Sequence, residues 1–569
     1  MLTFSSGLSA AQEQALKAEQ TDASRSSDED QLDLANLLEF TIESASRQKE
    51  PLKEAPVPVT VITSEMIRSI GARNLKDVLT AYVPGMTPII DHNESNVAMR
   101  GIYASSQQKI LVMIDGRRLN QRAYLAAATG HGISINPDKV AQIEVLRGPG
   151  SSVYGNVALS ATVNIVTKRG EDIDGMKLRA GGGNFGQIRS DIAYGKTFDE
   201  DHELVLYGSF YRASGEDFSV STEESYVENL QTETPIAGNV VIDGANTPVN
   251  YDFGLRFRIG NLTLVAQTRF DKHTEPYTAL GRTGDIYDED ELRTVRGVGP
   301  GLGMQGSALG ASYSQEIVDG FTLTLDVGYD VNSVQSSAAS SSNGGGVFFS
   351  WDEQALYGIL QARYDYTLGG LGDGNILVGA HVDWWRLVDS ILVTGTEGEL
   401  VNVADNSRAL LLLTGTESSY SGFFQVKQRL GRSFIVNVGG RLDYKTRRNN
   451  TGDFDTEPPE VDDVVVFSPR AAVIFTPTSN FDVKLSFADS FVDSPYWYRY
   501  NSLPTYAGAF DLRPEKLRSV QLTPSIRLLD GALLMTLNTS WNSLTDGIYR
   551  VPDARVNSGD PFYNNAGQL

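Results

Sequence analysis

Several stretches in the second half of the chain alternate strictly between apolar and polar residues. From Phe321 to Asp330 every second residue is apolar, and the residues between them are threonine, aspartate or glycine. The same two-residue period recurs in residues 434–444 and 481–487. Because successive side chains of a β-strand point to opposite faces, each stretch predicts a strand with one apolar and one polar face.

The connections between these strands alternate in length. Short turns such as Gly260-Asn261, Asp319-Gly320 and Gly431-Arg432 contrast with long polar loops at 214–250, 273–301, 395–417 and 449–463. This alternation is typical of outer-membrane barrels, whose strands cross the bilayer with about ten residues. A soluble β-sandwich, which also alternates, is the alternative. Aromatic residues near strand ends suit the girdles at the two membrane interfaces; they are Trp351, Tyr357, Trp384, Trp385 and Trp541.

A mixed pattern occupies residues 50–170 and predicts a small α+β domain. A β-branched strand at 57–62 precedes a helix that Thr63 or Ser64 can cap. Asn74 can cap a second helix, whose apolar face has helical spacing. That face consists of Leu75, Val78, Leu79 and Tyr82.

Residues 142–169 read QIEVLRGPGSSVYGNVALSATVNIVTKR. The glycines and Pro149 predict a tight bend between two strands. Together with two earlier stretches, this string resembles the plug domain of TonB-dependent outer-membrane receptors. The earlier stretches are VAMRGIYASSQQKILVMIDGRRLN (97–120) and PVPVTVITSEMIRSIGARNLKDVLTAYVPGM (56–86). The family usually has a glycine pair where Ser160-Ala161 stand, which leaves the local packing open.

The resemblance implies an all-β transmembrane antiparallel barrel with the N-terminal α+β plug domain inside it. About 22 strands are expected for the family fold, in the outer membrane of a Gram-negative bacterium. We count about 16 strands and no C-terminal aromatic residue. We therefore expect a chain that lacks about six C-terminal strands, with a complete smaller barrel as the alternative.

The expected domains are a flexible arm with a possible signal remnant (1–34), a TonB-box-like segment (35–49), the plug (50–170) and the barrel (171–569). In the family, an extended segment before the plug pairs with TonB, which couples it to the proton-driven motor of the inner membrane. An alternating, β-capable segment suits strand addition to a partner sheet. The residues expected to contact TonB are Glu39, Phe40, Thr41, Ile42, Glu43 and Ser44. A plain linker is the alternative.

Charged residues of the plug motifs are costly to bury without partners. In the family, the arginines at positions 100 and 147 bond to carboxylates of the inner barrel wall. The resemblance therefore implies a plug–barrel lock, in which Glu515 is the candidate barrel carboxylate and Gln521 replaces a second glutamate. The expected lock residues are Arg100, Glu144, Arg147, Lys168 and Glu515.

Composition and net charge exclude several classes of function. The net charge is -23, which argues against binding nucleic acid. There is no cysteine, the five histidines show no metal-ligand spacing, and no nucleophile–base set occurs. We therefore expect no enzyme activity, no metal site and no cofactor.

The resemblance implies active uptake of a small solute, with a ferric siderophore, a metal chelate, as the commonest family ligand. Cobalamin and oligosaccharides are alternatives, and no haem-receptor motif is matched. A passive porin-like channel or a surface binding module is the alternative of another class. Aromatic and arginine side chains near the loops could bind a flat or anionic ligand. Together with two histidines they form the expected ligand site, which consists of His92, Tyr103, Tyr124, His131, Tyr496, Trp497, Tyr498, Arg499 and Tyr500.

Overall fold

The computed structural model describes residues 40–90, 95–104, 107–130, 132–215, 218–221, 239–242, 247–273, 284–285, 301–339, 345–396, 412, 414–449, 461–500, 509–529, 532–551 and 563–566. Glu39, His92 and His131 from the predicted sites lie outside these residues. So does most of each predicted long loop.

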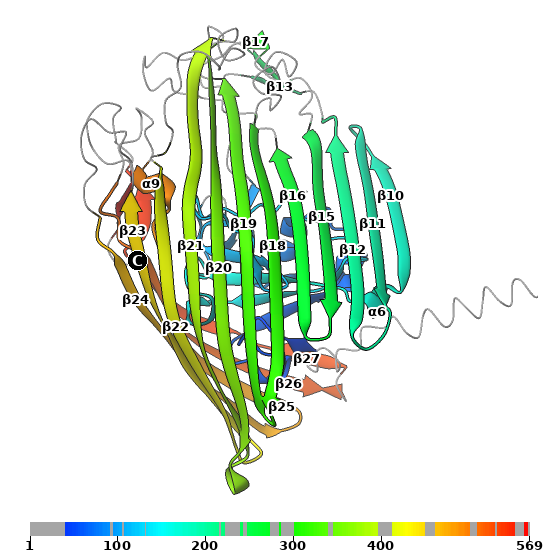
Figure 1. Cartoon of the computed structure of the whole chain (residues 1–569), viewed down its shortest axis with the longest axis vertical. Coiled ribbons are helices and arrows are strands. Elements are labelled where there is room, and N and C mark those ends of the chain that lie inside the picture. The colour runs from blue at the N-terminus through cyan, green and yellow to red at the C-terminus, as the bar shows by residue number, and fades with distance from the viewer. Residues whose placement is uncertain are drawn as a thin grey trace, which may run out of the picture.

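One sheet of 16 antiparallel strands dominates the described part of the chain. Figure 1 shows its curved wall, in which β18 to β21 are long strands, with the plug in blue behind it. The strands are β10 (Gly175–Gly183), β11 (Gln187–Thr197), β12 (His202–Ala213), β15 (Thr247–Ile259), β16 (Leu262–His273), β18 (Gly301–Val318), β19 (Phe321–Ala339), β20 (Gly345–Thr367), β21 (Asp373–Thr396), β22 (Gly415–Leu430), β23 (Phe434–Asn449), β24 (Val464–Thr478), β25 (Phe481–Val492), β26 (Glu515–Leu528), β27 (Leu533–Thr536) and β28 (Thr539–Thr545).

Neighbouring strands of this sheet follow one another in the chain, as the predicted hairpins require. β28 pairs with the first half of β26, and β27 pairs with its second half. Among the described residues β10 pairs with neither of them, so the described sheet has two edges.

The apolar faces of the strands point away from the plug. On β19, Leu325 is 45% exposed, whereas Asp330 on the opposite face is 6% exposed. On β23, Leu442 is 51% exposed and Asp443 is 3% exposed. An apolar outer band around a polar interior is what a bilayer requires of a barrel. The strand prediction is confirmed.

The predicted aromatic girdle is wrong in part. Trp351 and Trp385 are 3% and 2% exposed and pack in the interior, and Tyr357 lines an internal cavity. Trp541 is 58% exposed on the outer face. Whether each aromatic side chain points to lipid or to the interior depends on its place in the apolar–polar alternation. Its distance from a strand end does not determine this.

The plug contains a five-stranded sheet, with the order β3-β8-β9-β6-β7. Thr63 caps α3 by accepting a hydrogen bond from the Met66 amide, and Asn74 caps α4 through the Asp77 amide, as predicted. α4 packs Leu75 and Leu79 into the plug core. The elements are β3 (Val59–Thr63), α3 (Ser64–Ser69), α4 (Leu75–Tyr82), β4 (Met86–Ile90), β5 (Ser95–Met99), β6 (Ile110–Ile114), β7 (Arg117–Arg118), β8 (Val140–Arg147), α5 (Ser151–Tyr154), β9 (Ala161–Thr167) and α6 (Gly170–Ile173).

Smaller elements complete the described chain. No described helix is long and apolar enough to cross a bilayer. The remaining elements are β1 (Thr41–Ile42), β2 (Glu50–Pro51), η1 (Leu52–Glu54), β13 (Phe218–Ser221), β14 (Asn239–Ile242), β17 (Gly284–Asp285), η3 (Gly369–Leu371), α9 (Tyr496–Tyr500), β29 (Ile548–Arg550) and β30 (Tyr563–Asn565).

Candidate functional site

The box-like segment is docked against the plug. Thr41 and Ile42 form β1, which pairs with β2, and Ile42 is fully buried beside Val61 and Leu146. The Glu144 carboxylate accepts hydrogen bonds from the Glu43 and Ser44 amides at 3.2 and 2.9 Å. A carboxylate on two backbone amides forms the stronger, charge-assisted kind of hydrogen bond.

The barrel holds the end of this segment and the residues that follow it. The Arg470 guanidinium on β24 donates to the Ala45 carbonyl at 2.6 Å. On β22, Lys427 forms ion pairs with Glu50 at 2.7 Å and Glu54 at 3.0 Å. The segment is therefore fixed on both sides, by the plug and by the inner barrel wall.

Arg100 and Glu515 both join the plug to the barrel, but not to each other. Arg100 donates to Gln521 at 3.2 Å and to Asn538 at 2.6 Å, so amide oxygens take the place of the expected carboxylates. Glu515 forms its ion pair with Lys109 at 2.7 Å. The predicted arginine–carboxylate pairing is thus replaced, because Gln521 supplies a neutral acceptor where the family usually has a charge.

The other lock residues lie apart from a barrel carboxylate. Glu144 binds the box-like segment, and its part in the plug–barrel lock stays a prediction. The Arg147 carbonyl accepts from Gln521 at 3.2 Å, and burial together with Arg100 lowers the pKa of the Arg147 guanidinium to about 10. Lys168 is half-buried, and burial lowers its pKa. Among the described residues neither Arg147 nor Lys168 forms an ion pair.

A set of plug–barrel contacts that sequence reasoning missed lies on the wall from β15 to β21. The Arg122 guanidinium pairs with Asp330 at 2.9 Å and Asp383 at 3.2 Å. Glu353 accepts from the Arg122 and Ala123 amides at 2.8 and 2.7 Å. Alternation already placed Asp330 on the inward face, but its partner in a plug loop carried no sequence signal.

A second buried pair extends this wall contact. The Lys139 ammonium lies 2.5 Å from Asp252, which also accepts from the Ser134 amide at 2.8 Å. Both charged side chains are at most 2% exposed. Removing one partner of such a pair leaves an uncompensated buried charge. These contacts hold Arg122, Ala123, Ser134 and Lys139 of the plug on the barrel wall.

Five of the predicted ligand residues form α9 and lie in one aromatic cluster. Tyr124 from the plug meets Trp497 and Tyr498 edge-to-face, with ring centroids 5.8 and 6.1 Å apart. Arg499 is fully buried and pairs with Glu417 at 2.5 Å. In this arrangement α9 covers the plug loop, and its side chains contact protein groups. Their ligand role stays a prediction.

Tyr103 lies apart from this cluster. It lines a pocket of about 450 Å³ with Arg100 and Lys109, against β26 and β28. The structure therefore brings Tyr124 together with α9 and leaves Tyr103 elsewhere. Within the described residues, no three His, Asp or Glu side chains are arranged to hold a metal ion.

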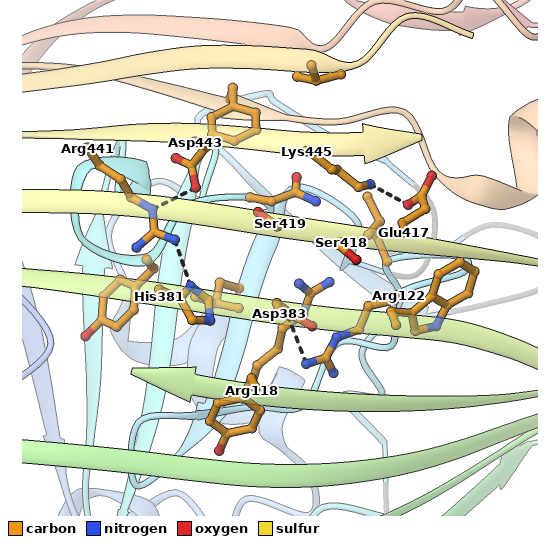
Figure 2. A pocket seen from close by; sticks show the side chains of 18 of the residues that line it. Arg118, Arg122, His381, Asp383, Glu417, Ser418, Ser419, Arg441, Asp443 and Lys445 are labelled. Carbon is orange, nitrogen blue, oxygen red and sulfur yellow. Dashed lines mark hydrogen bonds and ion pairs between the residues drawn. The ribbon is translucent and has the colours of Figure 1, made fainter. Parts of the chain in front are cut away.

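An internal cavity of about 100 Å³ separates the plug from strands β20 to β23 (Figure 2). Arg441 lies in it, with its Nε donating to Asp443 at 2.9 Å and one Nη donating to His381 Nδ1 at 2.8 Å. Gly155, at φ 76°, makes room for this guanidinium, because a Cβ there would lie 2.9 Å from Arg441 Nε. The missing side chain of Gly155 in the plug thus leaves the space that Arg441 of the barrel occupies.

Two family sequence models match the chain. The TonB-dependent receptor plug domain matches residues 51–162, and the TonB-dependent receptor-like β-barrel matches residues 207–569. The chain belongs to the TonB-dependent receptor family. A curated relative, the vitamin B12 transporter BtuB of Vibrio vulnificus, is 29% identical over 177 residues, which are 31% of this chain and 28% of that protein.

Solved structures share the fold. The pyoverdine outer-membrane receptor FpvA of Pseudomonas aeruginosa superposes with a TM-score of 0.63 at 14% identity, covering 94% of this chain and 76% of that one. The siderophore receptor PiuA of Acinetobacter baumannii gives 0.63 at 14% identity, covering 94% and 78%. The fold and family place this receptor in the outer membrane of a Gram-negative bacterium, with an N-terminal plug and a β-barrel.

Proposed function

We propose that this receptor takes up a scarce solute across the outer membrane, driven by TonB, and that the solute is a ferric siderophore. The docked strand at Thr41–Ile42, with Glu144 holding the next two backbone amides, carries the proposal. A short extended segment is suited to pair with the sheet edge of a partner. A pull on it would act on the plug through Glu144.

The ligand part of the proposal is supported by the fold neighbours, which include a pyoverdine receptor and a siderophore receptor. It is also supported by the aromatic cluster around Tyr124 and Trp497, since large rings suit flat chelates. A bound solute would have to displace α9 from the plug loop.

Cobalamin is the second candidate ligand. It is favoured by the match to a vitamin B12 transporter. That match leaves 72% of the relative's length unmatched, since it covers 28% of it. The transport mechanism would be the same, so the two candidates differ only in the solute.

Uptake in cells tests both parts. We expect cells that produce this receptor to accumulate one siderophore, loaded with radioactive iron, from a panel. We also expect the abundance of the receptor to rise when iron is depleted. Deleting residues 35–46 should abolish uptake while surface binding of the solute persists. The control variant Ile42→Val, which keeps a β-branched side chain, should transport normally.

Unchanged transport after the deletion would mean a passive channel and would overturn the TonB-driven mechanism. Uptake of cobalamin but of no ferric siderophore would replace the ligand and leave the mechanism standing.

A further inference from the structure

Two plug guanidiniums line the cavity between the plug and strands β20 to β23 without a carboxylate partner among the described residues. Within these residues, Arg118 donates to the carbonyls of Asn120 and Gln121, at 2.8 and 3.1 Å. Arg47 donates to the Val153 carbonyl at 3.5 Å. In the described part of the chain neither forms an ion pair, and burial lowers the pKa of both, to about 10 for Arg118.

Arg441 adds an unused donor to the same cavity. Its side chain is 1% exposed, and one of its Nη groups has no partner among the described residues. Its other Nη donates to His381 Nδ1 at 2.8 Å (Figure 2). Because arginine stays protonated, that ring nitrogen must accept, so the proton of His381 is on Nε2 and the ring is neutral. Arg47 and Arg441 both lie over the Phe423 ring, 6.0 and 5.7 Å from its centre.

The carboxylates of the cavity are already paired. Asp383 pairs with Arg122, Glu417 with Lys445, and Asp443 with Arg441. The second oxygens of Asp383 and Asp443 have no partner, but their charges are matched. Over the Phe423 ring, however, the described residues give the guanidiniums of Arg47 and Arg441 only one ion-paired carboxylate, that of Asp443. One of these two buried cations therefore has no ion-pair partner.

We propose that this cavity binds one small anionic group, a carboxylate or a phosphate monoanion, on Arg441 with Arg47 and Arg118 beside it. A buried cation is costly unless it is paired, and guanidinium donors match the oxygens of both groups. The volume of about 100 Å³ fits a group of this size and no whole chelate.

The cavity lies between the two parts of the proposed transport device. At one end Trp385 and Glu417 contact α9, through Tyr496 and Arg499. At the other end Arg47 belongs to the box-like segment, three residues after Ser44. This inference extends the proposed function, because an acidic group of the solute would pass the site next to Arg47. The anion site itself can be tested without transport.

Calorimetric titration of the purified full chain in detergent tests the site, with inorganic phosphate and with acetate as probes at constant ionic strength. We expect saturable binding at one site for the unchanged protein. Arg441→Gln should weaken binding about tenfold or more, because a charge-assisted hydrogen bond is lost. The control Arg363→Gln, which removes an arginine paired with Asp365 outside the cavity, should bind as before.

A second variant keeps the test decisive if Arg441→Gln folds poorly. Arg47→Gln removes a guanidinium that forms no ion pair among the described residues, and it should weaken phosphate binding several-fold. Absence of saturable binding by the unchanged protein, or equal binding by all these variants, would refute the site.

Uptake separates the two sources of the anion. Reduced uptake in Arg441→Gln with normal surface binding would assign the site to an acidic group of the solute. Normal uptake together with lost phosphate binding would assign it to a free cellular anion. If the unchanged receptor transports nothing, the proposed function fails while the titration still decides the anion site.

Discussion

At the scale of single residues, the plug is held by charges whose partners come from distant parts of the chain. Glu144 on β8 fixes the backbone of Glu43 and Ser44, and Arg122 bridges two barrel strands. Each contact is buried, so each is sensitive to the loss of one partner. Two predictions follow from these residues.

Glu144→Gln should loosen the box-like segment without unfolding the plug. The neutral amide accepts more weakly from the Glu43 and Ser44 amides, and a hydrogen bond to a charged group is worth about 1.5–3 kcal/mol. Hydrogen exchange of those two amides should accelerate about tenfold to a hundredfold. Glu65→Gln, in an exposed pair with Arg68, serves as the control. Unchanged exchange rates would show that Glu144 does not hold the segment.

Arg122→Leu should destabilise the whole receptor. The change leaves Asp330 and Asp383 buried without their cation, which costs about 3–5 kcal/mol. Thermal unfolding in detergent measures the loss. Arg68→Leu breaks an exposed pair and should cost less than about 1 kcal/mol. Equal effects of the two substitutions would contradict the buried network.

At the scale of elements, alternation assigns each strand residue to lipid or to the plug. β19 presents Leu325 outward and Asp330 inward, and β23 presents Leu442 outward and Arg441 inward. The outward residues need only be apolar, whereas the inward ones must match particular plug groups. The stability cost of a substitution on the outer face should therefore depend on its depth in the bilayer. On the inner face the cost should depend on which plug group the side chain contacts.

Leu325→Lys should destabilise the barrel by about 2–4 kcal/mol, because it places a cation on the lipid face, more than a full turn of the pleat inside β19 from its start at Phe321. Val318→Lys, at the β18–β19 turn, should cost only about 0–1 kcal/mol, since the side chain reaches the interface. Urea unfolding of the receptor reconstituted in lipid vesicles measures both. A larger cost at Val318 would invert the assigned depths.

At the scale of the whole molecule, plug and barrel share buried ion pairs along most of the described wall. Lys139–Asp252, Arg122–Asp330 and Lys109–Glu515 lie on strands far apart in the sheet. Contacts spread in this way couple the two domains, so neither should unfold alone.

Coincident unfolding of plug and barrel is therefore expected. All five tryptophans lie after residue 350, so intrinsic fluorescence reports on the barrel side. The chain has no cysteine, and Ser69→Cys on the exposed part of α3 can carry a dye that reports on the plug. The two signals should give one midpoint in a thermal scan. A plug transition at clearly lower temperature would mean that these ion pairs do not couple the domains.

The sequence by itself determined the strands, their faces, the helix caps and the family. These follow from local rules: a two-residue period sets the face of a strand, Thr63 and Asn74 cap helices, and the glycines with Pro149 after Arg147 set a bend. The tertiary structure alone decided which charges meet. Glu515 pairs with Lys109, Glu144 binds the box-like segment, and Arg47, Arg118 and Arg441 share a cavity, because such contacts join residues far apart in the chain, where no local pattern records them.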